Sequence, residues 1–211
     1  FGRAASPLSS LPVAVPVRRR ASRARASVEM QILVFLLDNL FFVLVFASLL
    51  RAWMNQSRLR MTEQPGRFVM ALSDWLVKPL RRALPNGLRQ ARLDWASLAA
   101  AALLALCHAL LLHLLSLILL PSFDWLSWVW TVPAQALLFL LRTVLQGLLA
   151  MTLVYALMSW IQPFSPIGGV LARLLAPLLQ PLRRRLPLVG GVDLSALVLI
   201  LLLQVLLLAL G

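Results

Sequence analysis

The segment KPLRRALP at residues 78–85 returns as QPLRRRLP at residues 180–187, with identical residues at six of the eight positions. The match keeps four prolines and four arginines at the same spacing: Pro79, Arg81, Arg82 and Pro85 in the first copy, and Pro181, Arg183, Arg184 and Pro187 in the second. Identity of this density between two parts of one chain indicates an internal duplication. The sequence therefore predicts a fold made of two related units.

The residues on either side of the segment support the same conclusion. An apolar stretch that ends at a tryptophan precedes each copy, and an aspartate and a serine at the head of another apolar stretch follow it: Asp94 with Ser97, and Asp193 with Ser195. Each predicted unit thus consists of an apolar helix, a basic amphipathic segment and a second apolar helix.

The apolar stretches have about the length of 20 residues that a helix needs to cross a hydrocarbon core of about 30 Å. We expect transmembrane helices at residues 32–53, 96–120, 134–160 and 193–210, amphipathic interfacial segments at residues 66–85 and 166–187, and an aromatic loop at residues 121–133. The predicted fold is an all-α membrane protein of about four transmembrane helices, with its first repeat at residues 30–120 and its second at residues 134–211.

The composition agrees with a membrane protein. Of the 211 residues 61% are apolar and 13% are charged, whereas soluble domains are about 45–50% apolar and about 25% charged. The net charge of +13 would suggest nucleic acid as a partner of a soluble protein, but no nucleic-acid-binding motif is present. Anionic lipid headgroups are the partner that we expect instead.

The distribution of cations predicts the orientation in the membrane. Nine lysines and arginines lie between Arg51 and Arg92 and four between Arg173 and Arg185, but there is none between residues 121 and 133 or after residue 185. By the positive-inside rule both basic segments face the cytoplasm and both termini lie outside it. Two crossings per unit also make the two repeats parallel.

Residues 1–29 carry six arginines and no helical apolar period. We expect this extension to be disordered. Because Met30 directly precedes the first apolar stretch, two alternatives remain: a native targeting segment, or an upstream extension of a chain that begins at Met30.

The motif Pro-Leu-Arg-Arg-x-Leu-Pro, the sequence Gly190-Gly191-Val192-Asp193 and the doubled architecture resemble the YggT family of bacterial inner-membrane proteins, over residues 31–211. The resemblance implies a small multi-pass inner-membrane protein associated with osmotic tolerance, cell division, envelope organisation or, in plastids, cytochrome assembly. It also implies a tight glycine turn before Asp193, which the first copy lacks. No single biochemical activity follows from it.

Several polar residues are candidates for a site. The paired arginines of each copy either bind lipid phosphates or only set topology. Asp94 and Asp193 either cap the next helix or form salt bridges back to the arginines. Asp38 and Arg142 lie inside predicted spans, where they either pair with each other between the repeats or extend separately to the outer interface.

The sequence offers no catalytic set of Ser, His and Asp, no paired-carboxylate site and no phosphate-binding glycine loop. His108 and His113 are about 140° apart around a helix, so we expect structural roles and no shared metal site. We therefore expect a protein that is not an enzyme and uses no cofactor or metal. It is expected to be a scaffold or assembly factor with a homo-oligomer or membrane proteins as partners; the alternative is a small oligomeric transporter or channel.

Overall fold

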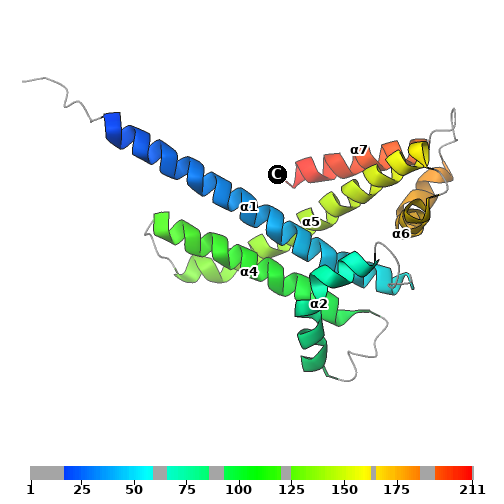
Figure 1. Ribbon diagram of the computed structural model, residues 1–211, viewed down its shortest axis with the longest axis horizontal. Coiled ribbons are helices and arrows are strands. Elements are labelled where there is room, and N and C mark those ends of the chain that lie inside the picture. The colour runs from blue at the N-terminus through cyan, green and yellow to red at the C-terminus, as the bar shows by residue number, and fades with distance from the viewer. Residues whose placement is uncertain are drawn as a thin grey trace, which may run out of the picture. The chain divides into compact units, whose positions relative to one another are not determined.

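The computed structural model describes residues 17–58, 66–85, 93–119, 125–162, 165–185 and 193–210. Within these ranges every regular element is an α-helix, as the sequence predicts. The helices are α1 (Val17–Gln56), α2 (Gly66–Ala83), α4 (Trp95–Leu119), α5 (Trp125–Ile161), α6 (Pro166–Arg183) and α7 (Leu194–Ala209) (Figure 1). By its internal contacts the chain divides into residues 1–37 and residues 38–211, and the packing described below lies within the second part.

Three of the described helices are long and apolar enough to cross a membrane. Their candidate spans are Val28–Gln56, Trp95–Leu117 and Trp128–Ile161. The apolar helix α7 is shorter, with 16 residues, and rises about 24 Å at about 1.5 Å per residue, compared with a hydrocarbon core of about 30 Å. The chain is thus built as a membrane protein, with three full-length candidate spans where the sequence predicted about four.

Two helices begin earlier than the sequence predicts. Helix α1 begins at Val17, so residues 17–29 are helical where disorder was expected; arginine and alanine favour helix, and this segment has no proline or glycine to interrupt it. Helix α5 begins at Trp125 and contains Pro133, so residues 125–133 are helical where a loop was expected. Residues 1–16 and 120–124 lie outside the described part of the chain.

The two connectors, helices α2 and α6, pack on different neighbours. Helix α2 packs on α4, whereas α6 packs on both α5 and α7. On α2 the buried positions recur at helical spacing: Gly66, Val69, Ser73 and Val77. Val77 packs against the small residues Ala96 and Ala100 of α4, while Val69 belongs to the apolar cluster that contains Met54 of α1. On α6 the buried positions are all leucines: Leu171, Leu174, Leu175 and Leu179. Each connector therefore packs one of its faces against the long apolar helices.

Helix α5 is the centre of the packing, because it contacts α4, α6 and α7. Helices α4 and α5 follow each other in the chain and run side by side, so the start of α4 and the end of α5 lie at the same end of the pair. Helix α2 contacts the start of α4 and α6 lies at the end of α5, and both are seen on the right of Figure 1. The two connectors therefore lie at one end of the helices.

Helix α1 approaches α5 closely at a glycine. A Cβ atom added to Gly147 would lie 2.1 Å from Cε2 and 2.3 Å from Cδ2 of the Phe46 ring. The ring of Phe46 is also stacked on Phe42, with centroids 5.9 Å apart. Small residues allow such close approach between membrane helices, where van der Waals packing drives association.

We predict that Gly147→Ala lowers stability by about 1–3 kcal/mol, because the added methyl group must displace the Phe46 ring from a packed site. Gly169→Ala is the matched control, since an added Cβ there meets nothing within 4 Å, and alanine favours helix over glycine by up to about 1 kcal/mol. Thermal unfolding in detergent measures both. Equal stability of the two variants would contradict the close approach, and Phe46→Leu should partly rescue Gly147→Ala.

Candidate functional site

Each of the two predicted aspartates caps the helix that follows it. Oδ1 of Asp94 accepts a hydrogen bond from the Ser97 backbone N–H at 3.3 Å, and its Oδ2 accepts one from the Ser97 hydroxyl at 2.9 Å. Asp193 accepts from the Ser195 backbone N–H at 3.1 Å and also from the Ser195 hydroxyl. A carboxylate satisfies free N–H groups and suits the positive end of the helix dipole. Capping is therefore present in both copies.

The same carboxylates also bind an arginine of the preceding connector. Nη2 of Arg81 lies 2.8 Å from Oδ2 of Asp94. Nη2 of Arg183 lies 2.5 Å, and its Nε 3.0 Å, from Oδ2 of Asp193. Arg81 and Arg183 occupy the same position in the repeated segment, so the two copies make the same contact. The sequence left capping and ion pairing as alternatives, whereas the structure combines them in one arginine–aspartate clamp at each connector.

The clamps hold both aspartates in their charged form. Burial would raise the pKa of Asp94, but hydrogen bonds from Ser97 and Arg81 outweigh it and leave that pKa below its ordinary value. In the same way burial would raise the pKa of Asp193, while bonds from Ser195 and Arg183 bring it below the ordinary value. A buried carboxylate with these partners stays ionised at neutral pH.

A second set of contacts ties each connector to the helix before it. In the first copy Nη1 of Arg51, a buried residue of α1, donates to the Ser73 hydroxyl at 2.9 Å and to Oδ1 of Asp74 at 2.7 Å. Lys78 pairs with Oδ2 of Asp74 at 2.8 Å. Hydrogen bonding to Lys78 and Arg51 lowers the pKa of Asp74 although burial opposes it. Sequence analysis counted Arg51 among the cations that set the orientation and gave it no partner.

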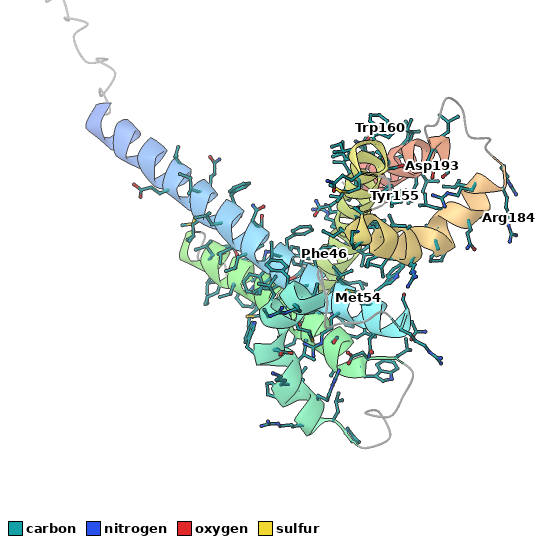
Figure 2. All side chains as sticks on the ribbon, turned by 45° about the vertical axis from the view of Figure 1, so that its right-hand side comes forward. Phe46, Met54, Tyr155, Trp160, Arg184 and Asp193 are labelled. Carbon is teal, nitrogen blue, oxygen red and sulfur yellow. The ribbon has the colours of Figure 1, made fainter. Side chains whose placement is uncertain are left out.

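In the second copy one arginine makes both connections. Arg183 donates to the hydroxyl of Tyr155 on α5 at 2.5 Å as well as to Asp193. Figure 2 shows Tyr155 and Asp193 close together where α5 and α7 meet α6, with Arg184 pointing away at the end of α6. Tyr155 was missed by sequence analysis; it is the only tyrosine of the chain, but nothing in the residues around it indicates a partner more than 20 positions away.

The remaining predicted motif residues lie at the surface. Arg82 and Arg184 are exposed, and so are Pro79, Pro85 and Pro181. Pro79 and Pro181 fall within α2 and α6 rather than in turns. Pro187, Gly190 and Gly191 lie outside the described residues, so the predicted glycine turn stays a prediction.

In the described part of the chain each of the two ionisable residues inside the spans contacts a different helix. Oδ1 of Asp38 lies 2.7 Å from Nε2 of His108 on α4. Nη2 of Arg142 donates to the Leu210 carbonyl at 3.0 Å, at the end of α7. Sequence analysis left pairing and separate extension to the outer interface as alternatives and named neither His108 nor the Leu210 carbonyl as a partner, because depth in the membrane does not fix the direction in which a side chain leaves its helix.

His108 is buried between aromatic rings. Its ring centroid lies 4.0 Å from that of Phe139 on α5 and 5.3 Å from that of Phe41 on α1. Asp38 connects to this cluster from α1, and its side chain is 47% exposed. The Asp38–His108 contact joins α1 to α4 within the first predicted repeat, and the stacking of His108 on Phe139 reaches α5 of the second.

The family model for CCB3/YggT matches residues 30–115 and again residues 134–211. The chain belongs to the CCB3/YggT family. The uncharacterized protein YggT of Escherichia coli K12 is 35% identical over 177 residues, which cover 83% of this chain and 87% of that protein. An uncharacterized protein of the proC 3' region of Vibrio alginolyticus is 31% identical over 171 residues, covering 81% of this chain and 88% of that protein. No solved structure matches the chain.

We predict that Arg183→Gln destabilises this CCB3/YggT-family protein by about 1 kcal/mol, at the low end for a charged hydrogen bond because the Arg183 side chain is 41% exposed and partly screened. The neighbouring variant Arg184→Gln, at an exposed position, should change stability little. Unfolding in detergent at neutral pH measures the difference.

The difference should depend on pH with a defined sign. Because the pKa of Asp193 is lowered in the fold, the clamp contributes fully above the unfolded value of about 3.9 and is lost as the pH falls through the lower, folded value. The penalty of Arg183→Gln should therefore shrink as the pH falls below about 4, to the part that the bond to Tyr155 contributes. A penalty that is unchanged at low pH would show that Arg183 stabilises the fold without its contact to Asp193.

Proposed function

We propose that this protein is a non-enzymatic scaffold or assembly factor of the bacterial inner membrane, related to envelope organisation, whose two connectors lie on the cytoplasmic leaflet. The observation that carries the proposal is the pair of arginine–aspartate clamps. They fix α2 and α6 against the ends of the transmembrane helices, where fixed surfaces can position lipids or other membrane proteins.

The proposal rests on two parallel repeats. The family model matches the chain twice, and Arg81 and Arg183, which are equivalent in the repeated segment, contact equivalent aspartates. Helix α7 is then the fourth crossing, although short. Its C-terminal end is held to α5, because Arg142 donates to the carbonyl of Leu210, and a cation suits the negative end of a helix.

The charge of the connectors favours an anionic surface. Arg82, Arg173, Arg184 and Arg185 are exposed on or beside α2 and α6. Each cation near an anionic leaflet contributes about 1 kcal/mol of attraction, and cytoplasmic segments are enriched in such residues. This distribution supports connectors inside the cell and both termini outside it.

Helix α2 also has an apolar surface that the protein does not cover. Phe68 is 60% and Trp75 59% exposed, and they lie seven residues apart, two turns along the same face. Aromatic side chains beside cations are typical of a helix that lies in the headgroup region. The side of α2 turned away from α4 is thus suited to the bilayer or to the membrane domain of a partner.

A transporter or channel linked to osmotic adaptation is the second candidate. It is favoured by the contact between Asp38 and His108, because ionisable groups within a span are costly and often mark an ion or proton path. The transport path would require an oligomer, since four helices enclose little space. The two candidates differ in what they require of Asp38: the scaffold needs it for packing only, whereas the transporter needs its charge.

We predict that a photoreactive residue placed at Arg82 or Arg184 in living cells forms a discrete cross-link to another membrane protein. The same residue at Leu103 or Leu153, which are about half exposed on the transmembrane helices, should give diffuse lipid adducts only. A scaffold presents its partners at the connectors, so cross-links at the control positions alone would contradict the proposal.

Flux measurements separate the second candidate. Purified protein in proteoliposomes should not accelerate the movement of K⁺, protons or small osmolytes if it is a scaffold. Solute flux that wild-type protein supports and Asp38→Asn abolishes would replace the scaffold proposal with the transporter.

A further inference from the structure

A cleft of about 450 Å³ lies between α1, α4, α5 and α6. Pockets that hold small molecules range over about 300–1,000 Å³, so the cleft has the size of a binding site. Two of its walls come from residues 30–120 and two from residues 134–211, the two predicted repeats. It therefore lies where the two halves of the protein meet.

The lining of the cleft changes in polarity along its length. At one end lie Phe46 of α1 and Val144 of α5, and its middle is formed by apolar residues such as Leu98. At the other end lie Gln56 and Asp94. The polar end coincides with the end of α1 and the start of α4, which is also the end that holds the connectors.

The depth of the cleft equals about one leaflet. Its α1 wall runs from Phe46 to Gln56, and ten residues of helix rise about 15 Å. Half of a hydrocarbon core of about 30 Å is also about 15 Å. The apolar end thus reaches the middle of the bilayer when the polar end is at the headgroups.

The size of the cleft favours a slender occupant over a helix. The cleft has a volume of about 450 Å³, whereas a helix about 10–12 Å wide with its side chains fills on the order of 1,200–1,700 Å³ over the same length. The transmembrane helix of a partner or of a second copy is therefore too large for it. A single unbranched hydrocarbon chain fits, and it can follow an irregular apolar wall.

A cation stands at the polar end of the cleft. Arg81 binds Asp94, which lines the mouth, and the side chain of Arg81 remains 48% exposed. A guanidinium has five N–H donors, and among the described residues the structure shows one of its nitrogens, Nη2, directed at Asp94. The rest of the fork can bind a phosphate oxygen with charge-assisted hydrogen bonds.

We propose that this cleft is a binding site for one phospholipid, whose acyl chain lies between the two halves of the protein and whose phosphate contacts Arg81. A chain in this position fills the apolar space from the mouth to Phe46. The bound lipid then acts as part of the packing between the two halves. This inference depends on the helices crossing a bilayer but on neither the scaffold nor the transporter function.

The test uses the full chain purified in detergent and measured by native mass spectrometry with added phosphatidylglycerol. We expect one phospholipid retained per chain. Leu98→Trp, which fills the cleft, should weaken retention at least tenfold, while Leu103→Trp, at a residue that is 49% exposed on the same helix and does not line the cleft, should leave retention unchanged. Thermal unfolding verifies that both variants fold.

Equal retention by all three proteins would overturn the site and indicate lipids bound only around the outside of the helices. A second measurement uses wild-type protein and so does not depend on the folding of Leu98→Trp. A phosphatidylglycerol with a photoreactive group at the end of its acyl chain should label the peptides around Phe46 and Val144. Adducts spread over exposed residues such as Leu103, or a cross-linked dimer joined through the cleft, would also overturn the proposal. None of these outcomes bears on the connector cross-links, so failure of this site is distinguishable from failure of the scaffold.

Discussion

The carboxylate at the head of α4 and of α7 is the constraint on which the arrangement of the connectors depends. A helix that enters a bilayer has free N–H groups at its first turn, and a nearly buried aspartate that accepts them needs a cation to remain charged. Arg81 and Arg183 supply that cation from the connectors. Cap and cation lie 13 residues apart in the first copy and 10 in the second, so the same contact closes over segments of different length.

The two copies differ in the contact that ties the connector to the preceding helix. In the first copy the tie to the preceding helix is separate, through Arg51 to Asp74, while in the second Arg183 reaches both Asp193 and Tyr155. The second connector consequently depends on a single side chain, and it is further buried by leucines against α5 and α7. The first connector packs on α4 through smaller residues. The first connector is thus held more by ion pairs and the second more by apolar packing.

Much of this arrangement could be predicted from the sequence, for physical reasons that particular residues illustrate. The length of the apolar stretches predicts the long helices, and the positions of Asp94 and Asp193 at the start of such stretches predict the helix caps. Both signals are local in the sequence. The partner of Asp38 could not be predicted, since residue counting gives only its depth and His108 enters through the rotation of α4. The predicted loop was wrong from residue 125 to Pro133 for a different reason. Pro133 lies within α5, where the helix continues on both sides of it despite its missing N–H. The cleft between the halves depends on tertiary packing and has no signal in the sequence.

Parallel repeats with cytoplasmic connectors require α2 and α6 to lie on the same side of the membrane, so the accessibility of the two connectors is the most direct measurement. On a Cys107→Ser background, single cysteines at Arg82, Arg184 and Trp130 are treated in intact cells with a thiol reagent that does not cross the membrane. Labelling of the cysteine at Trp130 alone, which is 74% exposed near the start of α5, is the result that parallel repeats predict. Labelling of one connector and protection of the other would mean that the repeats are inverted, and would contradict the account.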